Sequence, residues 1–219
     1  MSRNLKALGL ALVASFAMSA VVASAASAEA YSFKADTVPT TLTGNQHAGN
    51  DVFTTDTGTV SCNIATYEGT QTVTPTNSVT VKPSYGECRA FGLFNVPIHV
   101  NGCEYKFTAG TKVSGNYEGT VDIVCPTGKF IEVTAPGCLV TVGAQNNLGK
   151  VTYTNIGIGA TKEVTVDVNI TGLAYEEHRP PFGICTNNTV PQTDGTYVGA
   201  GLVTGENPVT KAHHGVFVG

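Results

Sequence analysis

The sequence has no tryptophan and few charged residues, and both absences narrow the classes of protein that it can encode. Lysine, arginine, aspartate and glutamate together make up 13% of the chain. The basic residues occur singly, so the clustered positive charge that binds a nucleic acid backbone is missing. We therefore expect no nucleic acid partner. Without tryptophan, tyrosine is the remaining candidate for an aromatic platform that binds glycans.

Established catalytic signatures are also missing. The chain has no G-x-S-x-G nucleophile elbow, no H-E-x-x-H zinc motif, no Walker-type phosphate loop and no C-x-x-C pair. We accordingly predict a protein that is not an enzyme and that needs no metal or other cofactor.

The first 28 residues have the features of a secretory signal peptide. Arg3 and Lys6 give a positive start, Leu8 to Val22 form an apolar run, and Ala26-Ser27-Ala28 is a small-residue cleavage site. The alternative is a retained membrane anchor, but serines interrupt the apolar run, which falls short of the roughly 20 strongly apolar residues of a membrane span. We expect a mature protein that begins at Glu29, is secreted or associated with the cell surface, and has no stable membrane insertion.

Cleavage there leaves ten basic and sixteen acidic residues, a net charge of −6. No linker rich in proline, serine, glycine or charge divides the remaining chain. We predict one domain over residues 29–205, with residues 206–219 forming a C-terminal tail or a final short strand.

Alternating apolar and polar residues predict strands. The pattern holds for eight positions in Val164 to Thr171 and recurs from Phe94 to Val100, where Pro97 indicates an edge strand because it cannot donate to a ladder. No segment after residue 28 has a convincing helical pattern. Further expected strands are 59–65, 78–82, 102–108, 119–125, 129–134, 138–142, 150–154 and 196–204. The predicted fold class is all-β, an antiparallel β-sandwich or barrel-like domain.

Six cysteines follow the signal, an even number that predicts three disulfides in an oxidising compartment. Most of them share a strand face with apolar neighbours, Cys62 with Val60 and Ile64 for example, so they are expected to point inward. The six are Cys62, Cys88, Cys103, Cys125, Cys138 and Cys185.

One pairing follows from strand register. If a hairpin turns near Ser114 and Gly115, then placing Tyr105 opposite Ile123 sets Cys103 opposite Cys125, within disulfide reach. Cys62 with Cys88 and Cys138 with Cys185 then follow from chain order alone. The alternative is Cys125 with Cys138, which closes the segment CPTGKFIEVTAPGC on itself.

Five stretches carry a resemblance that spans nearly all of the mature chain. They are VFTTDTGTVSCNIATYEG, GCEYKF, VCPTGKFIEVT, VTYTN and GTYVGAGLVTG, in that order. The chain resembles an uncharacterised group of secreted actinobacterial β-rich proteins with the same landmarks. This resemblance implies export and a β fold, and no activity.

Titratable side chains give few candidates for chemistry. Glu176-Glu177-His178 is the densest polar cluster and is expected on a loop after a strand that ends near Ala174; with Asp167 it is the candidate site of a hydrolase. His213 and His214 are expected in a flexible tail, and His99 on a solvated strand face.

Three tyrosines begin a Tyr-x-Gly at an expected strand end: Tyr67, Tyr117 and Tyr197. We expect them to close the end of the β core with their hydroxyl groups in water, the alternative being a ligand platform.

Three functions remain open. The first is a secreted, non-catalytic β protein that is structural or adhesive at the cell surface or in the medium. The second is a binding module or inhibitor whose partner is an extracellular protein or glycan. The third is a secreted hydrolase with a site near Glu176 and His178.

Overall fold

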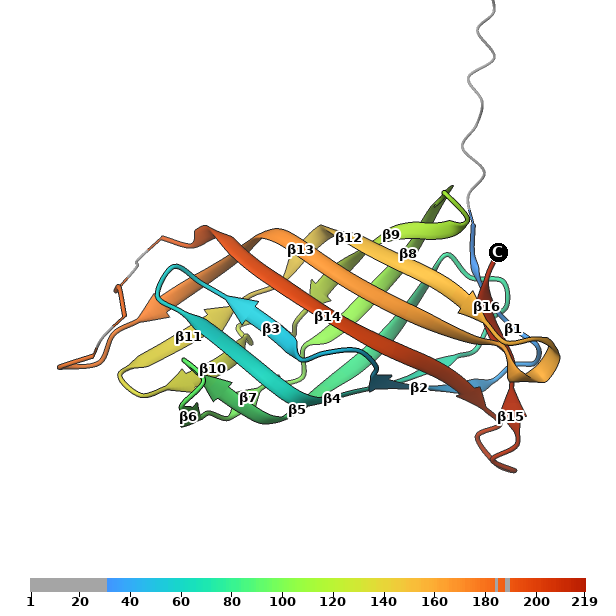
Figure 1. The fold of residues 1–219 in the computed structure, drawn as a ribbon, viewed down its shortest axis with the longest axis horizontal. Coiled ribbons are helices and arrows are strands. Elements are labelled where there is room, and N and C mark those ends of the chain that lie inside the picture. The colour runs from blue at the N-terminus through green and yellow to red at the C-terminus, as the bar shows by residue number, and fades with distance from the viewer. Residues whose placement is uncertain (1–30, 184, 188–189) are drawn as a thin grey trace, which may run out of the picture.

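The computed structural model describes residues 31–183, 185–187 and 190–219 (Figure 1). Over these residues it contains strands and one short 3-10 turn (Gly159–Thr161), and no α-helix. The predicted signal peptide and its cleavage site lie outside the described residues. No helix in the described part of the chain is long and apolar enough to cross a membrane. The strands are β1 (Phe33–Ala35), β2 (Thr40–Gln46), β3 (Asp51–Thr54), β4 (Thr59–Gln71), β5 (Ser78–Ala90), β6 (Phe94–Asn95), β7 (Ile98–His99), β8 (Glu104–Val113), β9 (Asn116–Val124), β10 (Ile131–Ala135), β11 (Cys138–Val142), β12 (Gln145–Ile156), β13 (Glu163–His178), β14 (Gln192–Glu206), β15 (His213–His214) and β16 (Val216–Val218).

The long strands close into an eight-stranded antiparallel barrel (Figure 1). The order runs β14, β2, β4, β5, β8, β9, β12 and β13, and β13 pairs back with β14. Strand β3 shares the position of β2, because it also lies between β14 and β4. The predicted all-β, antiparallel fold is confirmed, and of the two architectures the barrel is the one that forms.

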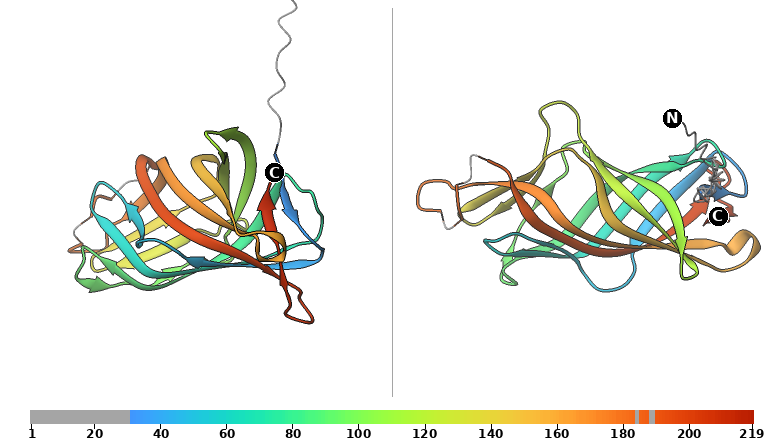
Figure 2. Two further views of the ribbon diagram at one scale, coloured as in Figure 1. Left: turned by 45° about the vertical axis from the view of Figure 1, so that its right-hand side comes forward. Right: turned by 90° about the horizontal axis from the view of Figure 1, so that it is seen from above.

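Shorter strands lie at the two ends of the barrel (Figures 1 and 2). At one end β11 pairs with the C-terminal part of β13 and continues through β10 to β7 at the sheet edge. The single strand expected from Phe94 to Val100 is split into β6, which pairs with β5, and β7, and Pro97 lies between them. At the other end β1 pairs with β16. Val216 and Val218 are buried there, so the last residues of the chain form strands that belong to the core.

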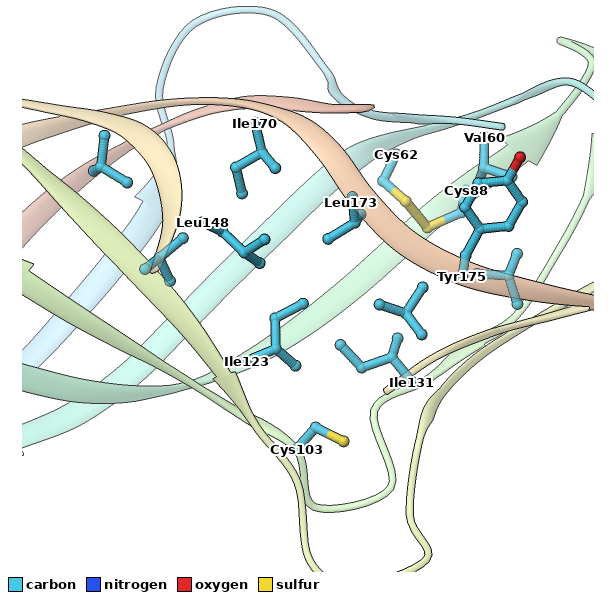
Figure 3. Close-up of a cluster of buried hydrophobic side chains, with 14 of the residues drawn as sticks. Val60, Cys62, Cys88, Cys103, Ile123, Ile131, Leu148, Ile170, Leu173 and Tyr175 are labelled. Carbon is cyan, nitrogen blue, oxygen red and sulfur yellow. A yellow bond between two sulfur atoms is a disulfide. The ribbon is translucent and has the colours of Figure 1, made fainter. Parts of the chain in front are cut away.

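All three predicted disulfides are present, and no described cysteine is free. Cys62 is bonded to Cys88, Cys103 to Cys125 and Cys138 to Cys185. Figure 3 shows the Cys62–Cys88 bond among the apolar side chains of the core. The alternative pairing of Cys125 with Cys138 is wrong.

The hairpin of β8 and β9 has the predicted register. Tyr105 lies opposite Ile123, and the turn falls at Ser114 and Gly115, which both have positive φ. Two positive φ values match the right-handed twist of the strands that they connect. The Cα atoms of Cys103 and Cys125 are therefore only 4.1 Å apart.

One predicted strand face is wrong. Val60 and Cys62 are buried as expected, but Ile64 is 45% exposed and Ala65 is buried in its place. Glu87 on the paired strand β5 has a φ of 51°, in the left-handed region. The β4–β5 pairing skips the position between Cys62↔Cys88 and Ile64↔Gly86 without a change of register, and beyond it both strands turn the other set of side chains inward.

Candidate functional site

The barrel encloses a cavity of about 130 Å³, which we call the barrel cavity. Most of its wall is apolar and comes from alternate residues of the long strands, such as Val121, Ile123, Val166 and Val168. Eight-stranded barrels have an interior that side chains fill or that holds one small ligand. A cavity of similar size engineered in another protein, about 150 Å³, binds benzene or xenon.

Asp51, the first residue of β3, brings a carboxylate to the wall of this cavity. Strand alternation places it on the same inward face as Phe53, and it is 2% exposed. Its Oδ2 atom accepts hydrogen bonds from the hydroxyl groups of Tyr67 (2.6 Å) and Tyr197 (2.9 Å). Its Oδ1 atom has no hydrogen-bond partner among the described residues. Oδ1 is fully buried beside Gly199, and the backbone amide of Ala200 lies near the carboxylate. A ligand in the cavity therefore meets Asp51 through its charge and through the hydroxyl groups bonded to it.

Four tyrosines surround Asp51 and form what we call the tyrosine cluster: Tyr67, Tyr85, Tyr105 and Tyr197. Their hydroxyl groups are linked, with oxygen separations of 2.8 Å between Tyr85 and Tyr105 and 3.4 Å between Tyr85 and Tyr197. The rings come from β4, β5, β8 and β14, which are spread around half of the barrel. The cluster thus forms one polar patch on an otherwise apolar wall.

Burial controls the charge states in this patch. Desolvation raises the pKa of Asp51, although the hydrogen bonds from Tyr67 and Tyr197 and the nearby backbone amide of Ala200 favour the charged form. Desolvation also raises the pKa of each tyrosine in the cluster well above its usual value, and the negative charge of Asp51 acts in the same direction. The tyrosines are therefore neutral hydrogen-bond donors at ordinary pH.

Small residues of β14 leave room for the carboxylate. A Cβ atom added to Gly199 would lie 2.4 Å from Oδ1 of Asp51, so a larger residue does not fit without moving the carboxylate. At Gly201, two residues along on the same face, the nearest atom to an added Cβ is 3.6 Å away. The close approach of Asp51 therefore depends on Gly199.

The predicted cluster Glu176-Glu177-His178 lies in the last three positions of β13, and its expected placement on a loop is wrong. Pairing of these residues with β11 extends the strand beyond Ala174. Glu176 and His178 are partly exposed and lie 3.6 Å apart, whereas Glu177 is fully buried on the opposite face. The barrel cavity is not lined by Glu176, His178 or Asp167.

Glu177 is held by two hydroxyl groups. Its Oε2 atom accepts hydrogen bonds from Thr57 and Thr186, each at 2.6 Å, and its Oε1 atom has no partner among the described residues. The carboxylate lies close to the sulfur atoms of Cys138 and Cys185. Those two sulfurs are bonded to each other, so they do not act as thiolate ligands for a metal.

The other histidines that we considered do not meet at one site. His99 is exposed, as expected. His213 and His214 form β15, so the prediction of a flexible tail is wrong; His214 contacts the Thr37 hydroxyl at 2.6 Å, and His213 lies 3.5 Å from Glu163.

The prediction for the Tyr-x-Gly tyrosines is wrong for two of the three. Tyr67 and Tyr197 direct their hydroxyl groups to the buried Asp51 and not to water. Tyr117 lies outside the cavity, with its ring 4.9 Å from that of Tyr31. We did not predict Asp51, Tyr85 and Tyr105 as site residues. The signal available in the sequence was the spacing of Asp51 and Phe53, which are two residues apart on a short strand and so face the same side.

Comparison with known proteins adds no relative: no protein-family model, no curated protein and no solved structure matches the chain.

Proposed function

We propose that this chain is a secreted, non-catalytic protein that binds a small, mainly apolar ligand inside its barrel. The observation that carries the proposal is the barrel cavity, with apolar walls and one patch of hydrogen-bonding groups around Asp51. Small-molecule sites are typically concave and apolar, with a few polar groups that fix orientation.

Several features support this binding role over the other two functions. A purely structural or adhesive protein has no need of a buried carboxylate with an unpartnered oxygen, because such a group costs stability. A hydrolase near Glu176 and His178 needs a further catalytic group in a concave pocket, and these side chains lie outside the barrel cavity. The three disulfides are compatible with a location outside the cell, as is the resemblance to secreted actinobacterial proteins.

Filling the cavity should abolish binding of small apolar probes. Val168→Phe places a large ring on the cavity wall, so benzene and 1-pentanol should no longer raise the melting temperature, whereas both should raise that of the unmodified protein. Thermal unfolding at increasing probe concentration measures the effect.

The matched control is Val198→Phe, the same substitution on the outer face of β14, where the side chain is 49% exposed. This variant should respond to the probes as the unmodified protein does. Equal responses in both variants, or no response in the unmodified protein, contradict the proposed function.

A further inference from the structure

Asp51 is a buried acidic group without a basic partner. It forms no ion pair with any described residue. Lys34 is the one basic residue among the described residues that line the barrel cavity, and its Nζ atom lies 6.0 Å from the centre of the Phe217 ring. Buried carboxylates in proteins are normally paired with a cation or neutralised. The unpaired Asp51 therefore favours a positively charged ligand group over a neutral or negative one.

The rings around Asp51 favour the same kind of ligand. The Tyr67 ring lies 6.4 Å from those of Tyr85 and Tyr105, the first nearly perpendicular and the second tilted by 41°. Their hydroxyl oxygens meet at Asp51 and at one another, so an ammonium head beside Asp51 can donate hydrogen bonds to them. The hydroxyl groups cannot supply the missing charge, because burial keeps the tyrosines neutral.

Cavity size limits the rest of the ligand. The volume of about 130 Å³ is close to that of the engineered cavity that accepts benzene, so it holds about six non-hydrogen atoms. Most of the cavity wall consists of apolar side chains such as Val121, Ile123 and Val166. These offer no hydrogen bonds, so the body of the ligand must be apolar.

We infer that the barrel cavity binds a small organic ammonium, with its charged head beside the Asp51 carboxylate, against the hydroxyl groups of the tyrosine cluster, and its apolar body along the valine and isoleucine side chains of the wall. This inference rests on the proposed function and specifies its ligand class.

The test compares three probes of equal length: n-pentylammonium, 1-pentanol and pentanoate. Titration calorimetry of the oxidised protein near pH 7 should give n-pentylammonium an affinity at least about tenfold higher than that of 1-pentanol, with pentanoate the weakest. Asp51→Asn keeps the side-chain shape and removes the charge, so n-pentylammonium should fall to within about twofold of 1-pentanol. Unchanged 1-pentanol binding by Asp51→Asn shows that the variant is folded and its cavity intact.

Lower pH provides a second measurement that needs no variant. Because burial raises the pKa of Asp51, its carboxylate gains a proton at a higher pH than an exposed aspartate does, and n-pentylammonium affinity should fall as the pH drops through that pKa. The affinity of 1-pentanol should change little. The other titratable side chains on the described cavity wall are Lys34, Tyr153 and the tyrosine cluster, and burial raises the pKa of these tyrosines further above the acidic range of this measurement.

The outcomes separate the two proposals. If 1-pentanol binds and n-pentylammonium binds no better, or if Asp51→Asn keeps the preference, the ammonium inference is overturned while the apolar binding site stands. If nuclear Overhauser contacts of bound n-pentylammonium reach the valine wall but not the tyrosine cluster, its head does not lie beside Asp51, which also overturns the inference. If no probe binds, the proposed function fails as well.

Discussion

Replacing Cys138 and Cys185 together by alanine should lower the free energy of unfolding by about 4 kcal/mol, the largest single effect that we expect. This disulfide closes the longest loop of the three, with a sequence separation of 47 residues. In the chain-entropy model, a longer closed loop gives a larger restriction of the unfolded chain and so a larger stabilisation. Urea unfolding followed by circular dichroism measures the change.

The native state should lose contacts as well, because this disulfide anchors a buried carboxylate. Thr186 follows Cys185 directly, and its hydroxyl group donates to the fully buried Glu177. A loosened connection leaves Glu177 with the single bond from Thr57, and removing a partner from a buried charged group typically costs ~1 to 3 kcal/mol or more. Amide hydrogen exchange should therefore accelerate where β11 pairs with β13.

The matched control removes the Cys62–Cys88 disulfide, which joins opposed residues of the β4–β5 ladder with a separation of 26 residues. The chain-entropy model gives about 3.5 kcal/mol for this loop, and backbone pairing still holds the two strands together. If losing Cys62–Cys88 costs more than losing Cys138–Cys185, the anchoring role of the latter near Glu177 is wrong.

The sequence was sufficient to predict the elements whose side-chain alternation runs unbroken. Tyr105, Phe107, Val121 and Ile123 keep their alternation, so the pairing that sets Cys103 opposite Cys125 was predicted from the period. A register shift between Ala109 and Lys112 separates this pairing from the turn, and the sequence did not predict it. The break at Ile64 could not be seen, because it lies where the paired strand has Glu87 in the left-handed region, and glutamate has no special preference for that conformation.

The candidate site was largely missed for a related reason. Strand β3 has only four residues, Asp51 to Thr54, too few for a periodic pattern to stand out. The tyrosine cluster comes from β4, β5 and β8, which pair in that order, and from β14, whose Tyr197 is 130 residues from Tyr67. The pairing of β14 with β2 and β3 brings Tyr197 to the others around Asp51. Glu177 was found as a residue but misplaced, because its strand continues only through pairing with β11.

Replacing Gly199 by alanine should disable the site and destabilise the fold. The added methyl group would lie 2.4 Å from Oδ1 of Asp51 and 3.1 Å from the Tyr197 hydroxyl group. One of these groups must move, which disrupts the hydrogen bonds that Tyr67 and Tyr197 donate to the carboxylate. Overpacking of this kind typically costs ~1 to 3 kcal/mol of unfolding free energy, and we expect the upper part of that range because a buried carboxylate is displaced.

Gly201→Ala is the control, because it adds the same methyl group on the same strand face, where the nearest atom is 3.6 Å away. Both glycines lack positive φ values, so backbone strain does not separate the two variants. Urea unfolding should leave Gly201→Ala within about 1 kcal/mol of the unmodified protein, and calorimetry should show that it still prefers n-pentylammonium to 1-pentanol. Gly199→Ala should lose stability and lose that preference together. If it retained the preference, the position of Asp51 Oδ1 would not determine what the cavity binds, and another group on the wall would have to recognise the ammonium head.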